Sequence, residues 1–327
     1  MSTLVKVENL YKEYPVPGEK KLKIHAVTDV SLEVERDQTL ALVGESGSGK
    51  TTVGKCLLRL EEVTKGKVYF DNQEIANIPY NDMRLMRKRM QMVFQEPYGS
   101  LNPRISGYKA IEEPMLLLTD FSKDEIRDQI YELAEVLDLT KKDLSMYPHE
   151  LTGGKAQKVC IARAMITKPD FVVHDEPTSF LDITSRAEIL TQLIRLQAER
   201  NLAYVYISHD MTTVKDISSH VAVMYLSKII EIGPKDEIFN HHIHPYTKAL
   251  LSSVLFPDPT TRRSKFRLIG EIPSPIKLPT GCALHKRCPI ATPLCAQMEQ
   301  QLVDIGSGHK VACHIVTKEH GGPVQIA

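Results

Sequence analysis

The sequence lacks a net charge, a long apolar segment and an apolar leader. Its 41 Lys and Arg residues are balanced by 41 Asp and Glu residues, so it has none of the basic excess with which nucleic-acid-binding proteins displace counterions. No apolar run approaches the roughly 18 residues that suggest a membrane span. The first residues, MSTLVKVENLYKEY, contain no apolar signal core. We therefore expect a cytosolic protein that does not bind nucleic acid.

Cysteine is also sparse. Six cysteines in a chain of 327 residues do not resemble the framework of a small secreted disulfide-rich domain, and cytosolic thiols stay reduced. The composition is otherwise that of a globular protein, with 42% hydrophobic and 25% charged residues, and the length suffices for two or three compact units. The cysteines therefore need an explanation other than disulfide bonding.

Short apolar runs alternate with helical patterns along much of the chain. The run QTLALVG at 38–44 ends in a glycine and leads into TTVGKCLLRL, which has helical periodicity. Two more apolar runs, at 171–175 and 203–210, bracket a segment whose apolar residues share one helical face. This alternation predicts an α/β fold with a mostly parallel sheet.

The rest of the sequence indicates two further parts. Residues 86–165 have helical patterns, including a run that Ser122 and Glu125 begin with capping-box spacing. From about His241 the composition shifts to Pro, His and Cys, which places a boundary near residue 240. We predict three parts: a core of residues 1–85 and 166–240, a helical insertion at 86–165, and a C-terminal segment at 241–327.

The segment GESGSGKT, residues 44–51, fits the eight-position phosphate-binding loop, or P-loop. It follows a predicted strand and opens a predicted helix, where glycines let backbone amides wrap phosphates and the helix N-terminus adds positive potential. Lys50 can reach the β and γ phosphates, and the Thr51 hydroxyl can ligate magnesium. The predicted nucleotide contacts here are Gly44, Glu45, Ser46, Gly47, Ser48, Gly49, Lys50, Thr51 and Thr52.

Polar residues end the next two predicted strands. In FVVHDEP, Asp175 and Glu176 stand where a parallel sheet delivers side chains to its ligand crevice. We expect Asp175 to hold magnesium through water and Glu176 to polarise the attacking water. His209, in ISHD, is expected to contact a γ phosphate. His174 replaces an apolar strand residue, and we interpret it as a neutral core histidine with one satisfied nitrogen rather than as a catalytic group.

These motifs together resemble the ATPase subunit of an ABC transporter over nearly the whole chain. The corresponding segments are Walker A at 44–51, the Q-loop at Gln95, the signature near Leu151, Walker B at Asp175 and the D-loop at 179–182. The resemblance implies a P-loop ATPase core with a RecA-like parallel sheet, an N-terminal antiparallel β subdomain and a helical insertion. It also implies that Gln95 contacts nucleotide and magnesium and couples them to membrane subunits, and that Tyr14, with Tyr11 as a rival, stacks on adenine.

Other segments narrow the resemblance to the oligopeptide and dipeptide importer branch, which includes nickel and glutathione importers. These segments are FQEPYGSLNPR at 94–104, HPYTKALLSSV at 244–254, and GEIPSP and GCALHKRCP in the tail. The resemblance implies an ATP-hydrolysing subunit at the cytoplasmic face of the membrane that energises uptake of peptides or a similar solute. It implies a heterodimer with a second ATPase, two transmembrane permease subunits and, indirectly, an extracytoplasmic solute-binding protein.

The signature, LTGGKAQK, departs from the family pattern LSGGQ followed by a basic residue, Gln and Arg. Thr152, Lys155 and Ala156 are the substitutions, while Gly153 and Gly154 remain. The two glycines preserve backbone approach to a γ phosphate, Thr152 keeps a hydroxyl, and Lys155 is able to add positive charge. Because a signature serves the partner's nucleotide, we hypothesise that the damage falls on the partner's P-loop site; the alternative is that the substitutions are tolerated.

Four cysteines in the tail have the spacing C-x5-C-x6-C-x17-C; they are Cys282, Cys288, Cys295 and Cys313. Clustered thiols in a reducing compartment favour a soft metal, although structural zinc sites usually use pairs about two to four residues apart. The resemblance implies a four-iron four-sulfur cluster, with zinc or unbound thiols as alternatives. Cys56 and Cys160 lie in apolar helical patterns and are expected in the core. The HHIH stretch at 241–244 is interpreted as a solvated linker.

Two other classes of function compete with the importer ATPase. A soluble ABC ATPase of DNA repair or translation is disfavoured by the contiguous motifs, the single ATPase unit and the absence of net charge. The second class is a redox-responsive binding module that uses nucleotide only as a ligand. Such a module would not turn over ATP, and loss of its cluster would abolish its binding to a partner. In the importers that the chain resembles, an external binding protein and the membrane subunits select the solute. Peptide as the solute is therefore predicted only from the resemblance to that family.

Overall fold

The computed structural model describes residues 2–252 and 266–319 and divides the chain into two compact units. The first unit contains Met1–Val5, Glu33–Thr39 and Tyr69–Ile207, and the second contains Lys6–Leu32, Leu40–Val68 and Ser208–Ala327. Within the described residues, no helix combines the length and the apolar character that a bilayer span requires. Each unit is considered separately below.

The first unit contains a buried parallel sheet. Strand β7 (Phe171–Asp175) pairs in parallel with β6 (Met90–Val93) and with β8 (Ala203–Ser208). Every residue of β7 and β8 is buried, as expected for parallel strands covered on both faces. The predicted strand at 171–175 is confirmed, and the strand predicted at 203–210 is present but ends at Ser208. The prediction of helix from residue 86 is wrong at β6, because a four-residue apolar run carries too little periodicity to reveal a strand.

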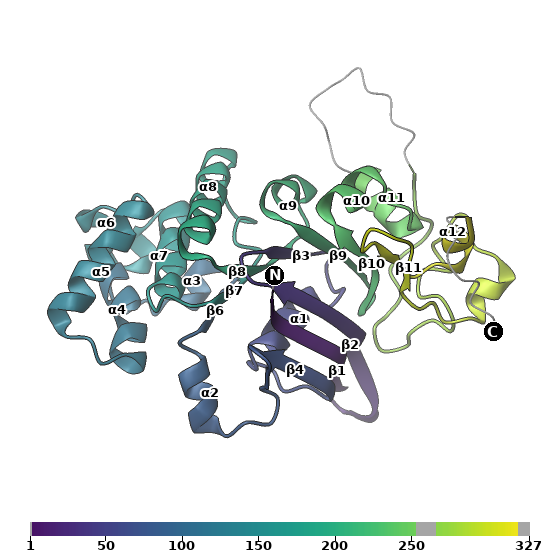
Figure 1. Cartoon of the computed structure of the whole chain (residues 1–327), viewed down its shortest axis with the longest axis horizontal. Coiled ribbons are helices and arrows are strands. Elements are labelled where there is room, and N and C mark those ends of the chain that lie inside the picture. Colours follow the sequence, from purple (N-terminus) through teal and green to yellow (C-terminus); the bar gives the residue numbers. More distant parts are fainter. Residues whose placement is uncertain (1, 253–265, 320–327) are drawn as a thin grey trace, which may run out of the picture. The chain divides into compact units, whose positions relative to one another are not determined.

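Helices form the rest of the first unit (Figure 1). They are α2 (Tyr80–Met86), α3 (Pro97–Ser100), α4 (Gly107–Leu118), α5 (Lys123–Val136), α6 (Lys141–Ser145), α7 (Gly153–Met165) and α8 (Ile183–Arg200), with a 3-10 turn at Pro148–Glu150. Helix α4 packs against both α5 and α7. The predicted capping box is confirmed, since Glu125 N donates to Ser122 Oγ at 3.3 Å and Ser122 N donates to the Glu125 carboxylate at 2.8 Å.

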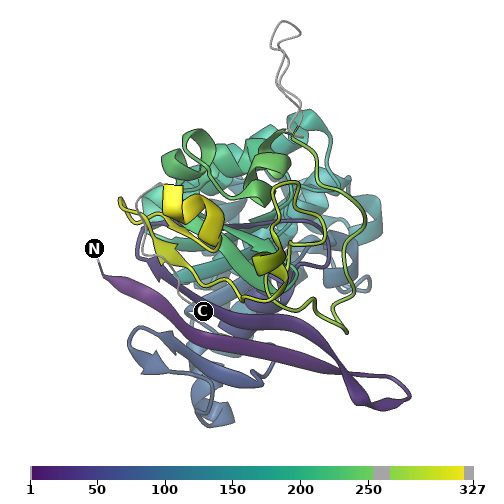
Figure 2. The same ribbon diagram turned by 90° about the vertical axis from the view of Figure 1, so that its right-hand side faces the viewer.

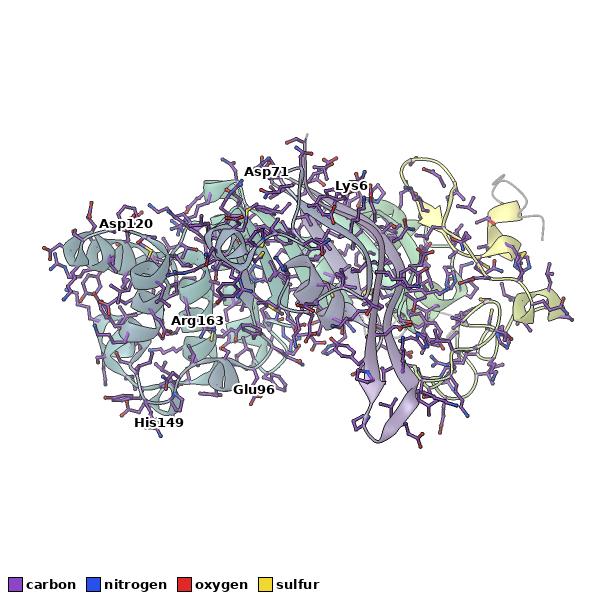
Figure 3. The ribbon with its side chains drawn as sticks, turned by 90° about the horizontal axis from the view of Figure 1, so that it is seen from below. Lys6, Asp71, Glu96, Asp120, His149 and Arg163 are labelled. Carbon is purple, nitrogen blue, oxygen red and sulfur yellow. The ribbon has the colours of Figure 1, made fainter. Side chains whose placement is uncertain are left out.

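Helix α7, which begins at the signature glycines, is fixed to α3 by a buried cysteine and an arginine. Arg163 is labelled in Figure 3, and its guanidinium donates to the Ser100 carbonyl at 2.6 Å. Cys160 is fully buried on the same helix, and Ser100 Oγ lies 3.3 Å from its sulfur. The prediction that Cys160 and Cys56 are core residues is confirmed, because both have at most 1% of their surface exposed.

The second unit contains two sheets. The long strands β1 (Thr3–Val16) and β2 (Glu19–Glu35) are neighbours, and β4 (Lys65–Phe70) lies on the other side of β1 (Figure 2). The short β5 (Gln73–Glu74) pairs antiparallel with the end of β4 at Tyr69 and Phe70, two residues of the first unit. This arrangement is the predicted N-terminal β subdomain.

The other sheet of the second unit joins the P-loop strand to the tail. Strand β3 (Thr39–Val43) runs parallel to β9 (His220–Tyr225), and β9 pairs antiparallel with β10 (Lys228–Pro234). The tail adds β12 (Lys310–Val311) to β10 and β11 (Val303–Asp304) to β12, both antiparallel. The helices of this unit are α1 (Lys50–Leu57), α9 (Met211–Ile217), α10 (Lys235–Asn240), α11 (Pro245–Ser252) and α12 (His314–Glu319), with a 3-10 turn at Pro293–Ala296.

A buried carboxylate, Glu231 on β10, anchors the tail to this sheet. Its Oε1 accepts hydrogen bonds from Ile243 N and from His309 Nε2, each at 2.9 Å. Glu231 has no exposed surface and His309 only 2%. Burial alone raises the pKa of a carboxyl, but the hydrogen bonds from His309 and Ile243 hold the pKa of Glu231 below its ordinary value.

The same anchor corrects the interpretation of HHIH as a solvated linker. His244 is 1% exposed, its N–H donates to Glu231 at 3.4 Å, and its Nδ1 accepts from Tyr246 N at 3.1 Å. Burial lowers the pKa of His244 to about 4, which keeps the imidazole neutral at pH 7. The stretch therefore turns inward at Ile243, where the backbone N–H groups of Ile243 and His244 donate to the buried Glu231 carboxylate.

Candidate functional site

The P-loop joins β3 to α1 and is shaped by glycines that no other residue can replace. A Cβ atom at Gly44, where φ is 148°, would lie 2.2 Å from the Met224 carbonyl oxygen. A Cβ atom at Gly49, where φ is 101°, would lie 2.1 Å from the Ala26 carbonyl oxygen. At Gly47, by contrast, no described atom would lie within 4 Å of a Cβ. Neighbouring backbone thus fixes the two ends of the loop, while open space lies over its middle.

Lys50, the first residue of α1, is folded over this loop. Its ammonium donates to the Gly44 carbonyl at 2.8 Å and the Glu45 carbonyl at 3.0 Å, and lies 3.5 Å from Ser48 Oγ. The side chain is 5% exposed, so its charge is concentrated at the loop. Thr51 and Thr52 follow in the first turn of α1. The cation and the helix N-terminus both favour an anion at this position.

The two candidate adenine-stacking tyrosines have different surroundings. Tyr14 interacts with Thr52 of α1 and with Glu61, and the Lys12 ammonium lies 4.7 Å from its ring centroid. Burial raises the pKa of Tyr14 to about 12. Tyr11 instead hydrogen-bonds with Asp29. The structure therefore brings Tyr14 into contact with the helix that follows the P-loop, and Tyr11 into contact with Asp29 of β2.

The acidic pair lies at the end of β7, in the first unit. Asp175 is 3% exposed, and Glu176 follows it with φ at 45°, a left-handed conformation that costs a non-glycine residue of order 1–3 kcal/mol. Glu176 N donates to the Ile207 carbonyl at 2.9 Å, which holds this turn against β8. The turn thus places Glu176 directly after the buried strand β7.

Two side chains hold the Glu176 carboxylate. Its Oε2 accepts from Ser179 Oγ at 2.8 Å and from Gln95 Nε2 at 3.2 Å. The structure thus brings Gln95 and Glu176 together. Ser179 was not assigned a role from the sequence, although its position three residues after Glu176 is the spacing at which a turn brings a hydroxyl back to a carboxylate. A second hydroxyl contact links the same turn to β8, since Thr178 Oγ1 lies 3.3 Å from Tyr206 Oη.

His174, next to this pair, is a core residue with an unexpected feature. It is fully buried, and its ring meets the Tyr204 ring edge-on, with centroids 4.6 Å apart at 86°. Burial lowers its pKa to about 3, so the predicted neutral form is correct. The prediction of one satisfied nitrogen is wrong, because neither ring nitrogen has a hydrogen-bond partner among the described residues. The rings of Tyr204 and Tyr206 lie beside His174, whereas a satisfied nitrogen would have required a polar group there.

This unpaired imidazole makes stability depend on pH. Its folded pKa is depressed below the ordinary value of 6.5, so below pH 6.5 the unfolded state binds a proton that the folded state does not, and stability falls as the pH falls. At pH 5 the loss is about 2 kcal/mol. We expect His174→Phe to remove this loss and to leave stability at pH 7 equal or higher, since no hydrogen bond is broken.

Urea unfolding at pH 7 and pH 5 measures this difference. Substitution of the exposed His241 by Phe is the matched control and should leave the pH dependence unchanged. An equal loss of stability between pH 7 and pH 5 in wild type and His174→Phe would contradict the assignment.

The signature residues begin α7 in the first unit. Thr152 is exposed and precedes the helix, and its carbonyl accepts from Ala156 N at 2.8 Å. A Cβ at Gly154 would lie 3.1 Å from Ser185 Oγ, whereas a Cβ at Gly153 would meet only Leu181, at 3.6 Å. Gly154 therefore allows close packing against the start of α8, and at the start of α7 Thr152 is exposed while Gly153 and Gly154 are half-buried.

Lys155 is engaged within its own unit. It forms an ion pair with Asp143, whose side chain is 4% exposed and also accepts from Thr140 N at 2.9 Å and Thr140 Oγ1 at 2.7 Å. Burial opposes ionisation of Asp143, but the Lys155 and Thr140 hydrogen bonds hold its pKa below the ordinary value. The expectation that Lys155 adds charge near a phosphate is therefore not supported; Asp143 neutralises that charge and ties α7 to α6.

The remaining predicted nucleotide residue, His209, lies in the second unit. It is exposed in the turn between β8 and α9, and the next residue, Asp210, caps α9 by accepting from Thr212 N at 2.9 Å. The cap fixes the backbone on the C-terminal side of His209. The structure thus places the P-loop, Tyr14 and His209 in one unit and Gln95, the acidic pair and the signature in the other.

The chemistry of the predicted magnesium ligands fits that ion. Magnesium prefers oxygen donors, and Thr51, Gln95 and Asp175 offer a hydroxyl, an amide oxygen and a carboxylate. The amide nitrogen of Gln95 is taken by Glu176, which leaves its oxygen as the donor for a metal. A bound ion would neutralise phosphate charge.

The four tail cysteines approach one another without forming a metal site. Cys282 N donates to the Cys295 carbonyl at 2.7 Å, and the Cys282 thiol is close enough to the other three for their charges to affect it. Burial raises the pKa of Cys282 to about 11. Within residues 2–252 and 266–319, however, no group of three or more His, Cys, Asp or Glu side chains is arranged to hold a metal ion. The donors suit an iron-sulfur cluster, but the predicted site is not preformed.

A glycine-rich loop at a helix N-terminus, a lysine folded over it and an acidic pair at the end of a buried parallel strand define a P-loop nucleoside triphosphatase. A family profile described as ABC transporter matches residues 27–179, and one described as oligopeptide/dipeptide transporter, C-terminal region, matches residues 230–295. The chain belongs to the family of ABC transporter ATP-binding proteins, in the branch that carries this C-terminal region.

Known proteins support this membership. The dipeptide transport ATP-binding protein DppF of Escherichia coli is 41% identical over 97% of this chain and 95% of its own length. The oligopeptide transport ATP-binding protein AppF of Bacillus subtilis is 38% identical over 96% of this chain and 97% of its own length. The dimeric post-hydrolysis structure of the ATP-binding cassette MJ0796 bound to ADP and Pi is 26% identical, with a TM-score of 0.66, and covers 71% of this chain and 99% of that one.

Proposed function

We propose that this chain is the ATP-hydrolysing subunit that energises peptide import across the cytoplasmic membrane. The observation that carries the proposal is that about 40% identity to dipeptide and oligopeptide transport ATP-binding proteins extends over nearly the whole chain, including the tail, where the oligopeptide/dipeptide C-terminal region matches. The intact P-loop and acidic pair support hydrolysis rather than nucleotide binding alone.

The proposed roles of the residues follow from their chemistry. Lys50 and the P-loop amides bind the β and γ phosphates, and Tyr14 stacks on adenine. Glu176, held by Ser179 and Gln95, polarises the attacking water, and His209 contacts the γ phosphate. Thr51, Gln95 and Asp175 hold magnesium. Catalysis of phosphoryl transfer consists mostly of positioning the reactants and stabilising charge. Holding the Glu176 carboxylate in place is therefore what Ser179 and Gln95 contribute to catalysis.

The proposed partners are a second ATPase subunit, two transmembrane permease subunits and, indirectly, an extracytoplasmic solute-binding protein. The start of α7, with Thr152 exposed and Gly153 and Gly154 half-buried, is the part that would contact the partner's nucleotide. Phe180 in the D-loop and Ile183 directly after it are 70% and 85% exposed, and two large apolar side chains at one turn suit burial against another subunit. The chain would thus act as a peripheral protein at the cytoplasmic face of the membrane.

Substrate-stimulated hydrolysis tests the proposed function. A complex would be purified from membranes through a tag on this chain, and its magnesium-dependent ATP turnover would be measured with the cognate binding protein loaded with peptide, nickel or glutathione. We expect stimulation by a dipeptide or oligopeptide. Stimulation by nickel or glutathione alone would refute peptide as the solute, and the absence of co-purifying membrane subunits would refute the transport role.

We further propose that the four tail cysteines bind a four-iron four-sulfur cluster, which requires their thiols to draw together from the positions described above. The mutual approach of the thiols and their soft donor chemistry support this. An anaerobic preparation should contain iron and sulfide and absorb visible light, and Cys288→Ser should remove both. A preparation with neither iron nor visible absorption would refute the proposal, and stoichiometric zinc would replace it.

A further inference from the structure

One residue of the P-loop, Glu45, is held by the C-terminal segment. The Arg287 guanidinium forms a two-pronged contact with the Glu45 carboxylate, with Nη1 to Oε2 at 2.9 Å and Nη2 to Oε1 at 3.3 Å. The Arg287 side chain is only 10% exposed. The Glu45 side chain is 33% exposed, and a two-pronged contact of this kind is stronger and more directional than a single-contact surface ion pair.

A second tail residue holds the backbone of Glu45. The Tyr246 hydroxyl accepts a hydrogen bond from Glu45 N at 2.8 Å. Tyr246 is 1% exposed, and its ring packs against Tyr225 with centroids 4.8 Å apart. The carbonyl of Glu45 accepts from Lys50 at 3.0 Å. The side chain, the N–H and the carbonyl of Glu45 are therefore each held, and two of the three partners come from the tail.

The tail segment that carries Arg287 is itself well fixed. Arg287 N donates to the Leu284 carbonyl at 2.8 Å, and its carbonyl accepts from Ile269 N at 3.0 Å. Its guanidinium carbon lies 5.7 Å from the Tyr225 ring centroid, so the ring that packs on Tyr246 also supports Arg287. The two tail contacts with Glu45 thus share one support, Tyr225 on β9.

We propose that Arg287 and Tyr246 form a clamp through which the C-terminal segment holds the P-loop in its nucleotide-binding shape, and that Arg287 is a positioning residue for ATP. This rests on the proposed function, because it takes the loop as an ATP site. Two effects act in the same direction. Releasing the loop adds an ordering cost to binding, and removing the guanidinium leaves the Glu45 carboxylate uncompensated near the incoming phosphates.

Nucleotide affinity of the full-length chain tests the clamp. We expect Arg287→Gln to weaken binding of the fluorescent analogue trinitrophenyl-ATP, with magnesium, roughly tenfold. Arg287→Lys should recover part of the loss, since it keeps the charge but not the two-pronged contact. Lys286→Gln, an exposed neighbour with the same change of charge, should bind as wild type. In the complex, the Arg287 variant should raise KM for ATP more than it lowers kcat.

A merely structural role for Arg287 would give a different pattern. In a Glu45→Gln background, Arg287→Gln should change affinity little, because the carboxylate that it neutralises is gone; an equal loss in both backgrounds would overturn the proposal. Wild-type affinity in folded Arg287→Gln would overturn it too. If Arg287→Gln fails to fold, Tyr246→Phe tests the other half, and unchanged affinity there would count against the clamp. Failure of wild type to bind the analogue would instead refute the proposed ATP site.

Discussion

Replacing Glu176 by Gln in this chain, with the partner ATPase unchanged, is expected to reduce ATP turnover of the purified complex at least about 100-fold. The substitution keeps an oxygen that accepts from Ser179 and Gln95, so the turn survives while the basic carboxylate is lost. We expect a nearly complete loss because this chain's own P-loop and acidic pair are intact, whereas in the proposed arrangement its altered signature would serve the partner's nucleotide. Turnover at saturating magnesium and ATP measures the effect.

The matched control is Glu132→Gln, an exposed residue of α5 that should leave turnover unchanged. The corresponding substitution in the partner ATPase completes the experiment. Near-normal turnover in Glu176→Gln would show that the partner's site drives transport and that LTGGKAQK still works there. Equal partial losses from the two substitutions would contradict the asymmetry of the two sites.

The largest effect on stability is expected at Glu231. Glu231→Ala removes the acceptor of two N–H groups and of His309, and breaking a buried pair of this kind costs about 3–5 kcal/mol. Glu231→Gln, which can still accept hydrogen bonds, should cost less. Because the pKa of Glu231 is lowered in the fold, its contribution to stability is fully present above the ordinary value of 4.5 and is lost as the pH falls through the lowered pKa.

Urea unfolding and amide hydrogen exchange at β12 together measure this effect. Exchange at Val311 should accelerate in Glu231→Ala, since the tail loses its anchor, whereas Glu271→Ala, an exposed control in the tail, should match wild type. Slow exchange at β12 in a destabilised Glu231→Ala protein would show that other contacts hold the tail.

Local sequence patterns were sufficient for the elements that carry the nucleotide motifs. Strand β3, the P-loop and α1 follow from one apolar run and its glycines, and the capping box at Ser122 follows from a spacing of three residues. Tyr14 was preferred over Tyr11 for adenine, and its contact with Thr52 supports that choice without testing it. The predictions of β3, α1 and the capping box succeeded because short-range geometry determines the structure at each of these positions.

Most of what the sequence did not reveal concerns partners that are distant along the chain. Arg287 and Glu45 are separated by 242 positions and His309 and Glu231 by 78, so no periodicity connects them. Lys155 forms its ion pair with Asp143, twelve residues earlier. This substituted signature residue therefore links α7 to α6. His174 was placed correctly in the core, but its neighbouring tyrosines are brought by another strand, which its own sequence context cannot reveal.

The two short strands of the tail, β11 and β12, also determine whether the edge of β10 is open to other molecules. Val311 and Lys310 pair with Glu231 and Ile232 of β10, and β11 places Asp304 opposite Lys310 on the outer side. Without them β10 would expose unpaired amide and carbonyl groups, which can recruit a strand from another chain. β11 and β12 are each two residues long and carry the charged pair Asp304 and Lys310. A strand from another chain could therefore form few hydrogen bonds at this edge. The tail therefore also protects this subunit against edge-to-edge aggregation.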